Sequence, residues 1–132
     1  MEYKADDKQL DAAKFLDLAE KVWPGSYDIV KTAEAVSKTV NITAYDGERL
    51  VGCLRVLTDG YFFGTITELL VLPEYQGRGI GSRLLKLASV SREWRNFTRK
   101  TAVRKVCSHI LLKNKSDKYD RPEYIYSGRF CF

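Results

Sequence analysis

A glycine-rich turn between an apolar strand and a helix constrains this chain more than any other feature of its sequence. Residues 68–81 read Glu-Leu-Leu-Val-Leu-Pro-Glu-Tyr-Gln-Gly-Arg-Gly-Ile-Gly. The apolar part has the length of a strand, and Pro73 cannot donate to a sheet, so the strand is predicted to end there. Leu84, Leu85 and Ala88 then recur at helical spacing. The pattern predicts a strand, a turn and a helix, with backbone amides gathered at the helix N-terminus.

The turn has the chemistry of an anion site. Three glycines at alternate positions, 77, 79 and 81, let the main chain approach a ligand without a Cβ in the way. A helix N-terminus carries about half a positive charge, and Arg78 and Arg83 add cationic donors. Two other phosphate loops do not fit, because Ser82 occupies the last glycine position of G-x-G-x-x-G and no Gly-Lys-Ser/Thr is present. The turn can therefore hold a phosphate or a pyrophosphate by another arrangement of its backbone amides.

Length and composition bound the class of protein. The 132 residues fit one domain, residues 1–132, with a single core. No apolar run approaches membrane-spanning length and the first residues lack the core of a signal peptide, so we expect a cytoplasmic protein without a membrane segment. Cys53, Cys107 and Cys131 are widely spaced and His109 is the only histidine, which argues against a disulfide framework and against a metal site.

The positive charge is concentrated at one end of the chain. Up to residue 91 there are 11 basic and 13 acidic side chains, whereas residues 92–132 carry 11 basic and 4 acidic ones. A basic tail can bind RNA or DNA through phosphates, so a nucleic-acid-binding module is one alternative. A solvated surface is the commoner outcome of such a run, and we do not expect nucleic acid as the partner.

Periodicity divides the first part of the chain into two helices and three strands. Asp7 or Asp11 is predicted to open a helix that Pro24 and Gly25 stop, and Asp28 to cap a second helix that ends near residue 38. Apolar and polar residues then alternate over residues 40–44, a hairpin follows at 46–47, and strands are predicted over 50–57 and 61–72. A short strand is expected at residues 2–4.

The strand ending in Val-Leu-Pro, the glutamine and the three glycines together resemble the GNAT family of N-acetyltransferases, over about residues 1–88. The resemblance implies an α/β (α+β) fold in which a mixed, mostly antiparallel sheet is flanked by helices. It also implies acetyl-CoA as co-substrate, with its pyrophosphate in the turn. The cofactor contacts that it implies lie at the strand end and in the turn: Leu70, Val71, Leu72, Gln76, Gly77, Arg78, Gly79, Ile80, Gly81 and Ser82.

The resemblance further implies an acetyl transfer to a primary amine, of a small molecule or a peptide, by direct attack. In the family a bulge separates the long strand from its neighbour, and the pantetheine arm pairs with the backbone groups that the bulge leaves unpaired. The N–H of Leu70 is the expected donor to the thioester oxygen. Glu68 stands where many members carry the base that takes the amine proton. The alternative for Glu68 is a half-exposed glutamate on the polar face of a strand. Aromatic residues 61–63 are expected on the acceptor side or in the core.

The chain departs from the family pattern after the motif helix, so residues 89–132 form an atypical basic tail. The family continues with a strand and then a Phe-Tyr-x-x-x-Gly-Phe-like segment whose tyrosine can protonate the leaving thiolate. When the codons allowed for residues 91–100 are read in a frame moved by one base, they can encode Pro-Gly-Met-Glu-Glu-Phe-Tyr-Lys-Lys. This reading is possible even though Trp94 has a single codon and so allows no choice at that position. We therefore hypothesise that residues after about Ala88 are frame-shifted. If the frame is intact, Tyr126 is the candidate acid.

An altered C-terminus has two consequences. A CoA-binding protein with weak or no catalysis becomes the second functional hypothesis. The edge of the cofactor strand would also be exposed unless the tail or a second chain covers it, and pairing of these edges would give a homodimer.

Overall fold

A five-stranded sheet in the order β1-β2-β3-β4-β5 organises the fold. The computed structural model describes residues 1–60 and 64–90 and the backbone of 129–130. The elements are β1 (Glu2–Lys4), α1 (Ala12–Val22), α2 (Ile29–Ser37), β2 (Val40–Asp46), β3 (Arg49–Thr58), β4 (Gly64–Val71), a 3-10 turn (Pro73–Tyr75), α3 (Ile80–Val90) and β5 (Arg129–Phe130). Neighbours from β1 to β4 pair antiparallel and β5 pairs parallel to β4. The expected mixed, mostly antiparallel sheet flanked by helices is confirmed.

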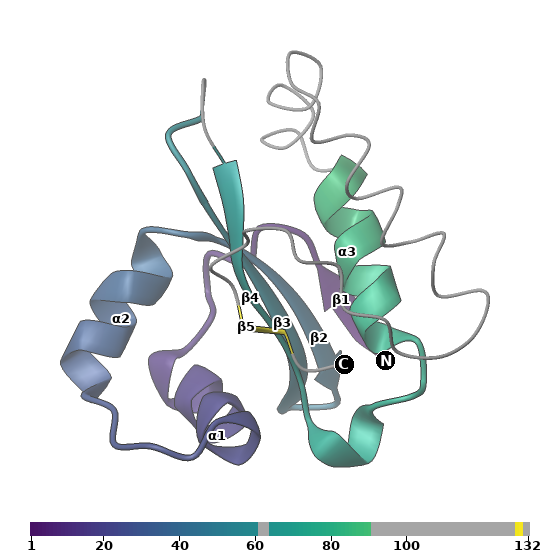
Figure 1. Ribbon diagram of the computed structural model, residues 1–132, viewed down its shortest axis with the longest axis horizontal. Coiled ribbons are helices and arrows are strands. Elements are labelled where there is room, and N and C mark those ends of the chain that lie inside the picture. Colours follow the sequence, from purple (N-terminus) through teal and green to yellow (C-terminus); the bar gives the residue numbers. More distant parts are fainter. Residues whose placement is uncertain (61–63, 91–128, 131–132) are drawn as a thin grey trace.

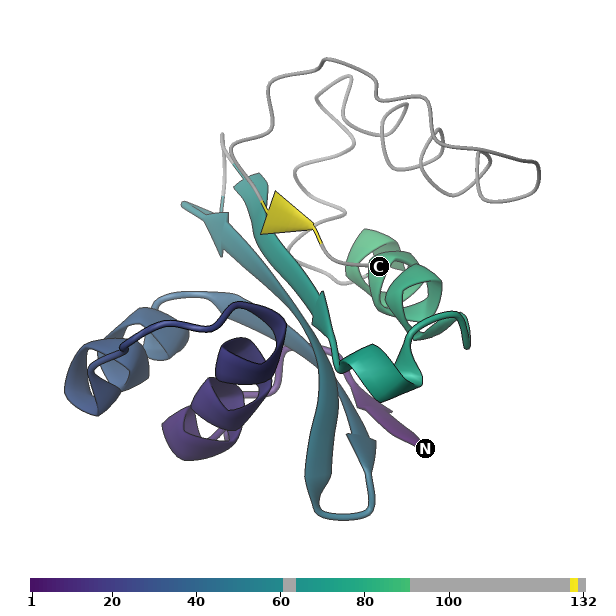
Figure 2. The same ribbon diagram turned by 60° about the horizontal axis from the view of Figure 1, so that its bottom comes forward.

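Helices cover both faces of the sheet. Figure 1 shows α1 and α2 on one side and α3 on the other, and the turned view of Figure 2 keeps this arrangement. Arg55 of β3 reaches the α1 face, where its guanidinium lies 5.1 Å from the centre of the Phe15 ring. On the opposite face, a Cβ added to Gly52 would meet Ile80 and Leu84 of α3 at 3.1 and 3.2 Å. The sheet is therefore the middle layer of three.

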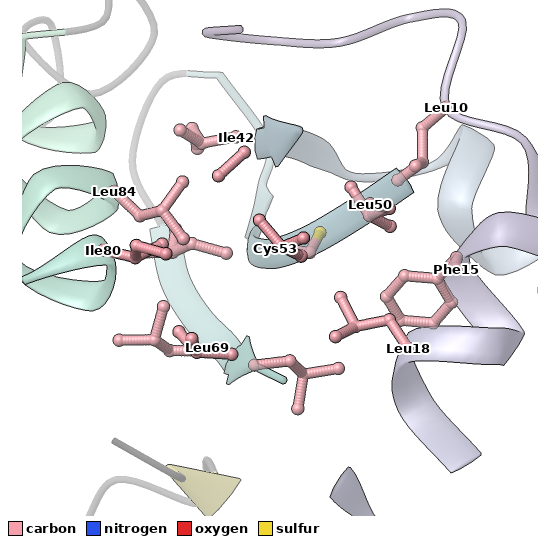
Figure 3. Close-up of a cluster of buried hydrophobic side chains, with 14 of the residues drawn as sticks. Leu10, Phe15, Leu18, Ile42, Leu50, Cys53, Leu69, Ile80 and Leu84 are labelled. Atoms are coloured by element: carbon pink, nitrogen blue, oxygen red, sulfur yellow. The ribbon is translucent and has the colours of Figure 1, made fainter. Parts of the chain in front are cut away.

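Apolar side chains from all three layers form one core. Leu18 of α1, Leu54 and Leu69 of the sheet and Leu84 of α3 are fully buried. In Figure 3, Leu18 and Phe15 approach the sheet from one side and Leu84 and Ile80 from the other. Burial of such side chains is the main term that favours folding, at about 25 cal/mol per Å² of apolar surface.

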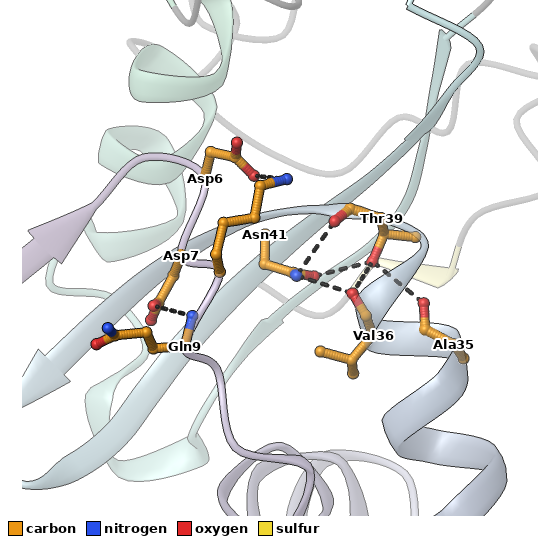
Figure 4. Close-up of polar contacts among 8 residues, drawn as sticks. Asp6, Asp7, Gln9, Ala35, Val36, Thr39 and Asn41 are labelled. Atoms are coloured by element: carbon orange, nitrogen blue, oxygen red, sulfur yellow. Dashed lines mark hydrogen bonds and ion pairs between the residues drawn. The ribbon is translucent and has the colours of Figure 1, made fainter.

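Strand β2 is buried on both faces, which the alternation in its sequence did not predict. Asn41 and Thr43 take the polar positions of the alternation, yet they are 2% and 0% exposed. The reason is that elements outside the sheet cover their face. Asn41 Nδ2 donates to the carbonyls of Val36 (3.0 Å) and Thr39 (3.2 Å), and Thr39 Oγ1 donates to Asn41 Oδ1 at 2.9 Å (Figure 4). Because these groups are paired, their burial costs little.

The two aspartates considered as the start of the first helix have different roles. Asp11 is the N-cap, since its Oδ1 accepts from the N–H of Ala13 at 2.9 Å. Asp7 is buried instead, and its carboxylate accepts from Thr43 Oγ1 at 3.0 Å and from the Tyr45 hydroxyl at 2.9 Å. Burial and this bond to Asp7 raise the pKa of Tyr45. Asp7 thereby fastens the loop before α1 to the sheet.

Some expectations near the candidate site differ slightly from the structure or lie outside the described residues. The strand predicted over 61–72 is described from Gly64 to Val71, and the aromatic residues Tyr61, Phe62 and Phe63 lie outside the described residues. Helix α3 runs to Val90, two residues past Ala88, after which the frame shift is hypothesised. The candidate acid Tyr126 also lies outside the described part of the chain.

Replacing Asp28 by alanine is expected to lower the free energy of unfolding by about 1 kcal/mol. Asp28 caps α2, because its Oδ1 accepts from the N–H of Lys31 at 2.8 Å. Urea denaturation of the wild type and of the variant measures the loss. Asp17→Ala is the control, since Asp17 makes an exposed ion pair with Lys21 that contributes about 0.5 kcal/mol or less. Equal losses for the two variants would contradict a capping role.

Within the described ranges, no helix has the length and apolar character needed to cross a bilayer. The same residues contain no group of three or more His, Cys, Asp or Glu side chains placed to hold a metal ion.

Candidate functional site

The candidate site begins where β4 ends. The N–H of Leu72 donates to the carbonyl of Val51 at 2.9 Å, the last bond from this segment to β3. A 3-10 turn follows, in which the N–H of Tyr75 donates to the carbonyl of Leu72 at 2.8 Å. Gln76 then reaches back, and its Nε2 donates to the carbonyl of Val71 at 3.0 Å. Gln76 therefore fixes the turn, while its contact with phosphate stays a prediction.

Two of the three motif glycines are required by the backbone itself. Gly77 has a φ of +74° and Gly79 a φ of +77°, a region that side chains with a Cβ rarely adopt. Gly81 has no positive φ, because it lies within the first turn of α3. The sequence pattern treats the three glycines alike, whereas the structure separates two turn glycines from one helical glycine.

A cleft of about 350 Å³ opens beside this turn. The first α-helical bond of α3 runs from the N–H of Arg83 to the carbonyl of Gly79 at 3.0 Å, so the amides of Ile80 and Gly81 lie at the open end of the helix. The cleft is lined by Val71, Tyr75, Gln76, Gly77, Gly79, Ile80, Gly81 and Ser82. A concave surface with a helix N-terminus is suited to an anion.

The structure brings together seven of the ten predicted cofactor residues and leaves three outside the lining. Leu70 and Leu72 are buried in the core, and Arg78 lies on the exposed side of the turn. Tyr75 lines the cleft but was not predicted to do so. Its position directly before the glutamine was the only signal in the sequence.

Strand register decides which amides of β4 face away from β3. Successive residues of a strand direct their N–H and C=O groups to opposite sides. Because Leu72 donates to β3, the groups of Val71 point away from β3, and the Val71 carbonyl indeed accepts from Gln76 instead. Leu70 points toward β3, opposite Cys53. The outward donor beside the cleft is thus the N–H of Val71, one residue from the expected Leu70.

A bulge interrupts the pairing of β3 with β4 just before Glu68. Arg55 lies opposite Glu68 while Val56 lies opposite Ile66, so Thr67 is the extra residue on β4. Strand β5 lies on the other side, with Arg129 opposite Glu68 and Phe130 opposite Leu69. In the described part of the chain, β5 thus covers two residues of the β4 edge and stops short of Val71.

Glu68 is held by an arginine in the layer between the sheet and α1. Arg55 Nη1 lies 3.0 Å from Glu68 Oε1, and the two side chains are 13% and 17% exposed. Burial raises the pKa of Glu68, and the nearby Arg55 opposes that rise. Glu68 is accordingly a paired, mostly buried carboxylate and not the half-exposed residue of the alternative interpretation.

The sequence model described as Acetyltransferase (GNAT) domain matches residues 38–119. The chain belongs to the GNAT family. The match to the GNAT model continues past residue 88, where the resemblance was expected to end, and reaches into the basic tail. The nucleotide sequence of the gene over residues 85–102 is the direct test of the predicted frame shift.

Known proteins similar to this GNAT chain include sequences and solved structures. A protein of Glycine max named probable acetyltransferase TAP2 is 32% identical in an alignment 81 residues long, and the match covers 52% of this chain and 32% of that protein. The match to the curated relatives spans only 25% to 37% of their length. A GNAT family protein of Streptococcus pneumoniae TIGR4 shares the fold, with a TM-score of 0.62, 24% identity, and coverage of 92% of this chain and 98% of the other. An aminoglycoside 6'-N-acetyltransferase complexed with coenzyme A gives a TM-score of 0.53 at 22% identity, over 67% of this chain and 56% of the other.

Proposed function

We propose that this GNAT protein is an N-acetyltransferase that moves the acetyl group of acetyl-CoA to a primary amine by direct attack. The observation that carries the proposal is the cleft in which the Val71 amide, the turn glycines and the N-terminus of α3 converge. A neighbour of the same fold is described as a complex with coenzyme A, which supports this choice of co-substrate.

In the proposed complex the pyrophosphate lies over the glycine turn. The amides at the start of α3 and the helix dipole favour its negative charge. The pantetheine arm runs from the turn along the edge of β4 beyond β5, and the N–H of Val71 faces this edge. One such amide aimed at the thioester oxygen is worth about 3 kcal/mol in the transition state.

Proton transfer in this scheme falls to Glu68. The amine nitrogen attacks the thioester carbon, a C–N bond forms, and the C–S bond breaks to release the thiolate of CoA. Glu68 in its ionised form takes the proton that the nitrogen loses. The thiolate takes a proton in turn, and Tyr126 is the proposed donor. The products are the N-acetylated amine and CoA.

The proposed acceptor is a primary amine on a small molecule or a peptide. Neighbours of this fold are described as aminoglycoside 6'-N-acetyltransferases and as the ribosomal-protein-S18-alanine N-acetyltransferase of Escherichia coli, so the fold accommodates both kinds of acceptor. We also propose a cytoplasmic location, and a homodimer in which open strand edges pair, because β5 covers only part of the described edge of β4.

The second candidate function is CoA binding with weak or no catalysis. The observation that favours it is that the sequence after the motif helix lacks the Phe-Tyr-x-x-x-Gly-Phe-like segment in which the proton donor is expected, although the match to the GNAT model extends to residue 119.

Binding and turnover of acetyl-CoA test the proposal together. We expect isothermal titration calorimetry to show one site per chain, and mass spectrometry to show acetylated products from a panel of amino sugars, amino acids and peptides. Binding without any acetylated product would favour the second candidate, and absence of binding would overturn both. Salt-sensitive binding to duplex DNA that acetyl-CoA does not affect would favour the nucleic-acid alternative.

A further inference from the structure

Tyr75 lines the cleft and joins the turn to the hairpin between β2 and β3. Its hydroxyl donates to Asp46 Oδ2 at 2.8 Å. Beside it, Arg49 Nη2 lies 2.6 Å from Glu74 Oε1. Residues 46 and 49 flank the hairpin, while 74 and 75 belong to the turn, so two polar contacts fasten the turn to the sheet.

Two guanidinium groups lie over the ring of Tyr75. The guanidinium carbon of Arg78 is 4.9 Å from the ring centre and that of Arg49 is 5.8 Å away. Both distances lie in the range of cation–π attraction, and donation of the phenolic hydrogen to a carboxylate enriches the ring in electrons. Arg49 already has Glu74 as its ion-pair partner. Arg78 makes no ion pair within the described residues, so its N–H groups remain available to a ligand.

We infer that Tyr75 is a positioning residue that holds Arg78 beside the cleft, where the guanidinium meets a phosphate of the bound nucleotide. The inference rests on the proposed function, since it assumes that coenzyme A occupies the cleft. Arg78 stands between the two turn glycines. Without the contact to the Tyr75 ring, its long, rotatable side chain would be free to turn into solvent. A ring fixed by Asp46 restricts the guanidinium before binding, which reduces the entropy lost when the phosphate is bound.

A double-mutant cycle on CoA affinity tests the inference. We expect Arg78→Met to raise the Kd of CoA about tenfold, as for the loss of one charge-assisted contact. Tyr75→Leu alone is expected to raise it about three- to fivefold, in line with an exposed cation–π pair. In the Arg78→Met background, Tyr75→Leu should change the Kd less than twofold, because the group that it positions is gone. Additive effects, or no effect of Arg78→Met, would overturn the inference.

The chain offers a matched control in a second tyrosine. Arg83 lies 4.9 Å from the ring centre of Tyr3, the same distance as in the pair of Arg78 with Tyr75. Tyr75 lines the cleft, whereas Tyr3 does not. Tyr3→Leu should leave the Kd unchanged, and an effect as large as that of Tyr75→Leu would contradict a local role.

The same titrations distinguish a failure of the proposed function from a failure of the inference about Tyr75. Failure of the wild type to bind CoA would overturn the proposed function and the inference together. Binding by the wild type with an additive cycle would overturn the role of Tyr75 alone.

Discussion

Replacing Glu68 by glutamine is expected to lower kcat/KM for amine acetylation by about 10²- to 10⁴-fold, the usual contribution of a general base. Glutamine keeps the size of the side chain and an oxygen that can accept from Arg55, but it cannot take a proton. Calorimetry should give an unchanged Kd for acetyl-CoA, because Glu68 is not among the residues that line the cleft. A loss smaller than about threefold would exclude Glu68 as the base.

The pH profile gives the same prediction a second readout. The base acts when ionised, so kcat/KM rises with pH through the pKa of Glu68. Burial raises that pKa, which places the acid limb of the profile above the ordinary titration of glutamate. Arg55→Met removes the cation that opposes the rise in the pKa of Glu68, so the acid limb should move to higher pH. Arg55→Lys keeps a cation at this position, so its acid limb should lie at lower pH than that of Arg55→Met. If the acid limb lies at the same pH in the wild type and in both variants of residue 55, a group other than Glu68 titrates.

Local patterns in the sequence predicted most of the fold. The caps at Asp11 and Asp28 were readable because a side-chain oxygen satisfies amides only two or three residues away. The end of β4 was readable from Pro73, and the turn from its glycines. Each of these features depends on neighbours along the chain, so one sequence contains the information.

Features that depend on distant partners were not readable. The burial of Asn41 follows from Val36 and Thr39 at the end of α2, and the pairing of Glu68 with Arg55 follows from a bulge whose position no propensity specifies. That bulge is also needed to know which side of β4 each amide faces. The sequence led us to expect the N–H of Leu70 as the thioester donor, whereas the register directs the N–H of its neighbour Val71 away from β3, so Val71 takes its place in the proposal.

Replacing Gly79 by alanine is expected to raise the Kd of acetyl-CoA by about 10- to 100-fold. A Cβ at this position meets no protein atom within 4 Å, so it stands in open space beside the cleft, where the pyrophosphate is proposed to lie. Loss of one hydrogen bond to the charged phosphate costs about 1.5–3 kcal/mol of binding free energy. That loss corresponds to a rise of about 10- to 100-fold in the Kd. Calorimetry of both proteins measures it.

Gly60→Ala is the control for backbone strain. Gly60 has the same φ of +77° and also has nothing within 4 Å of an added Cβ, but it lies in the turn after β3 and not in the cleft lining. Both variants should lose about 1 kcal/mol of unfolding free energy, because alanine is strained at positive φ. Only Gly79→Ala should weaken acetyl-CoA binding. If both weaken it equally, strain and not the geometry of the turn governs affinity, and the glycine turn is not the pyrophosphate site.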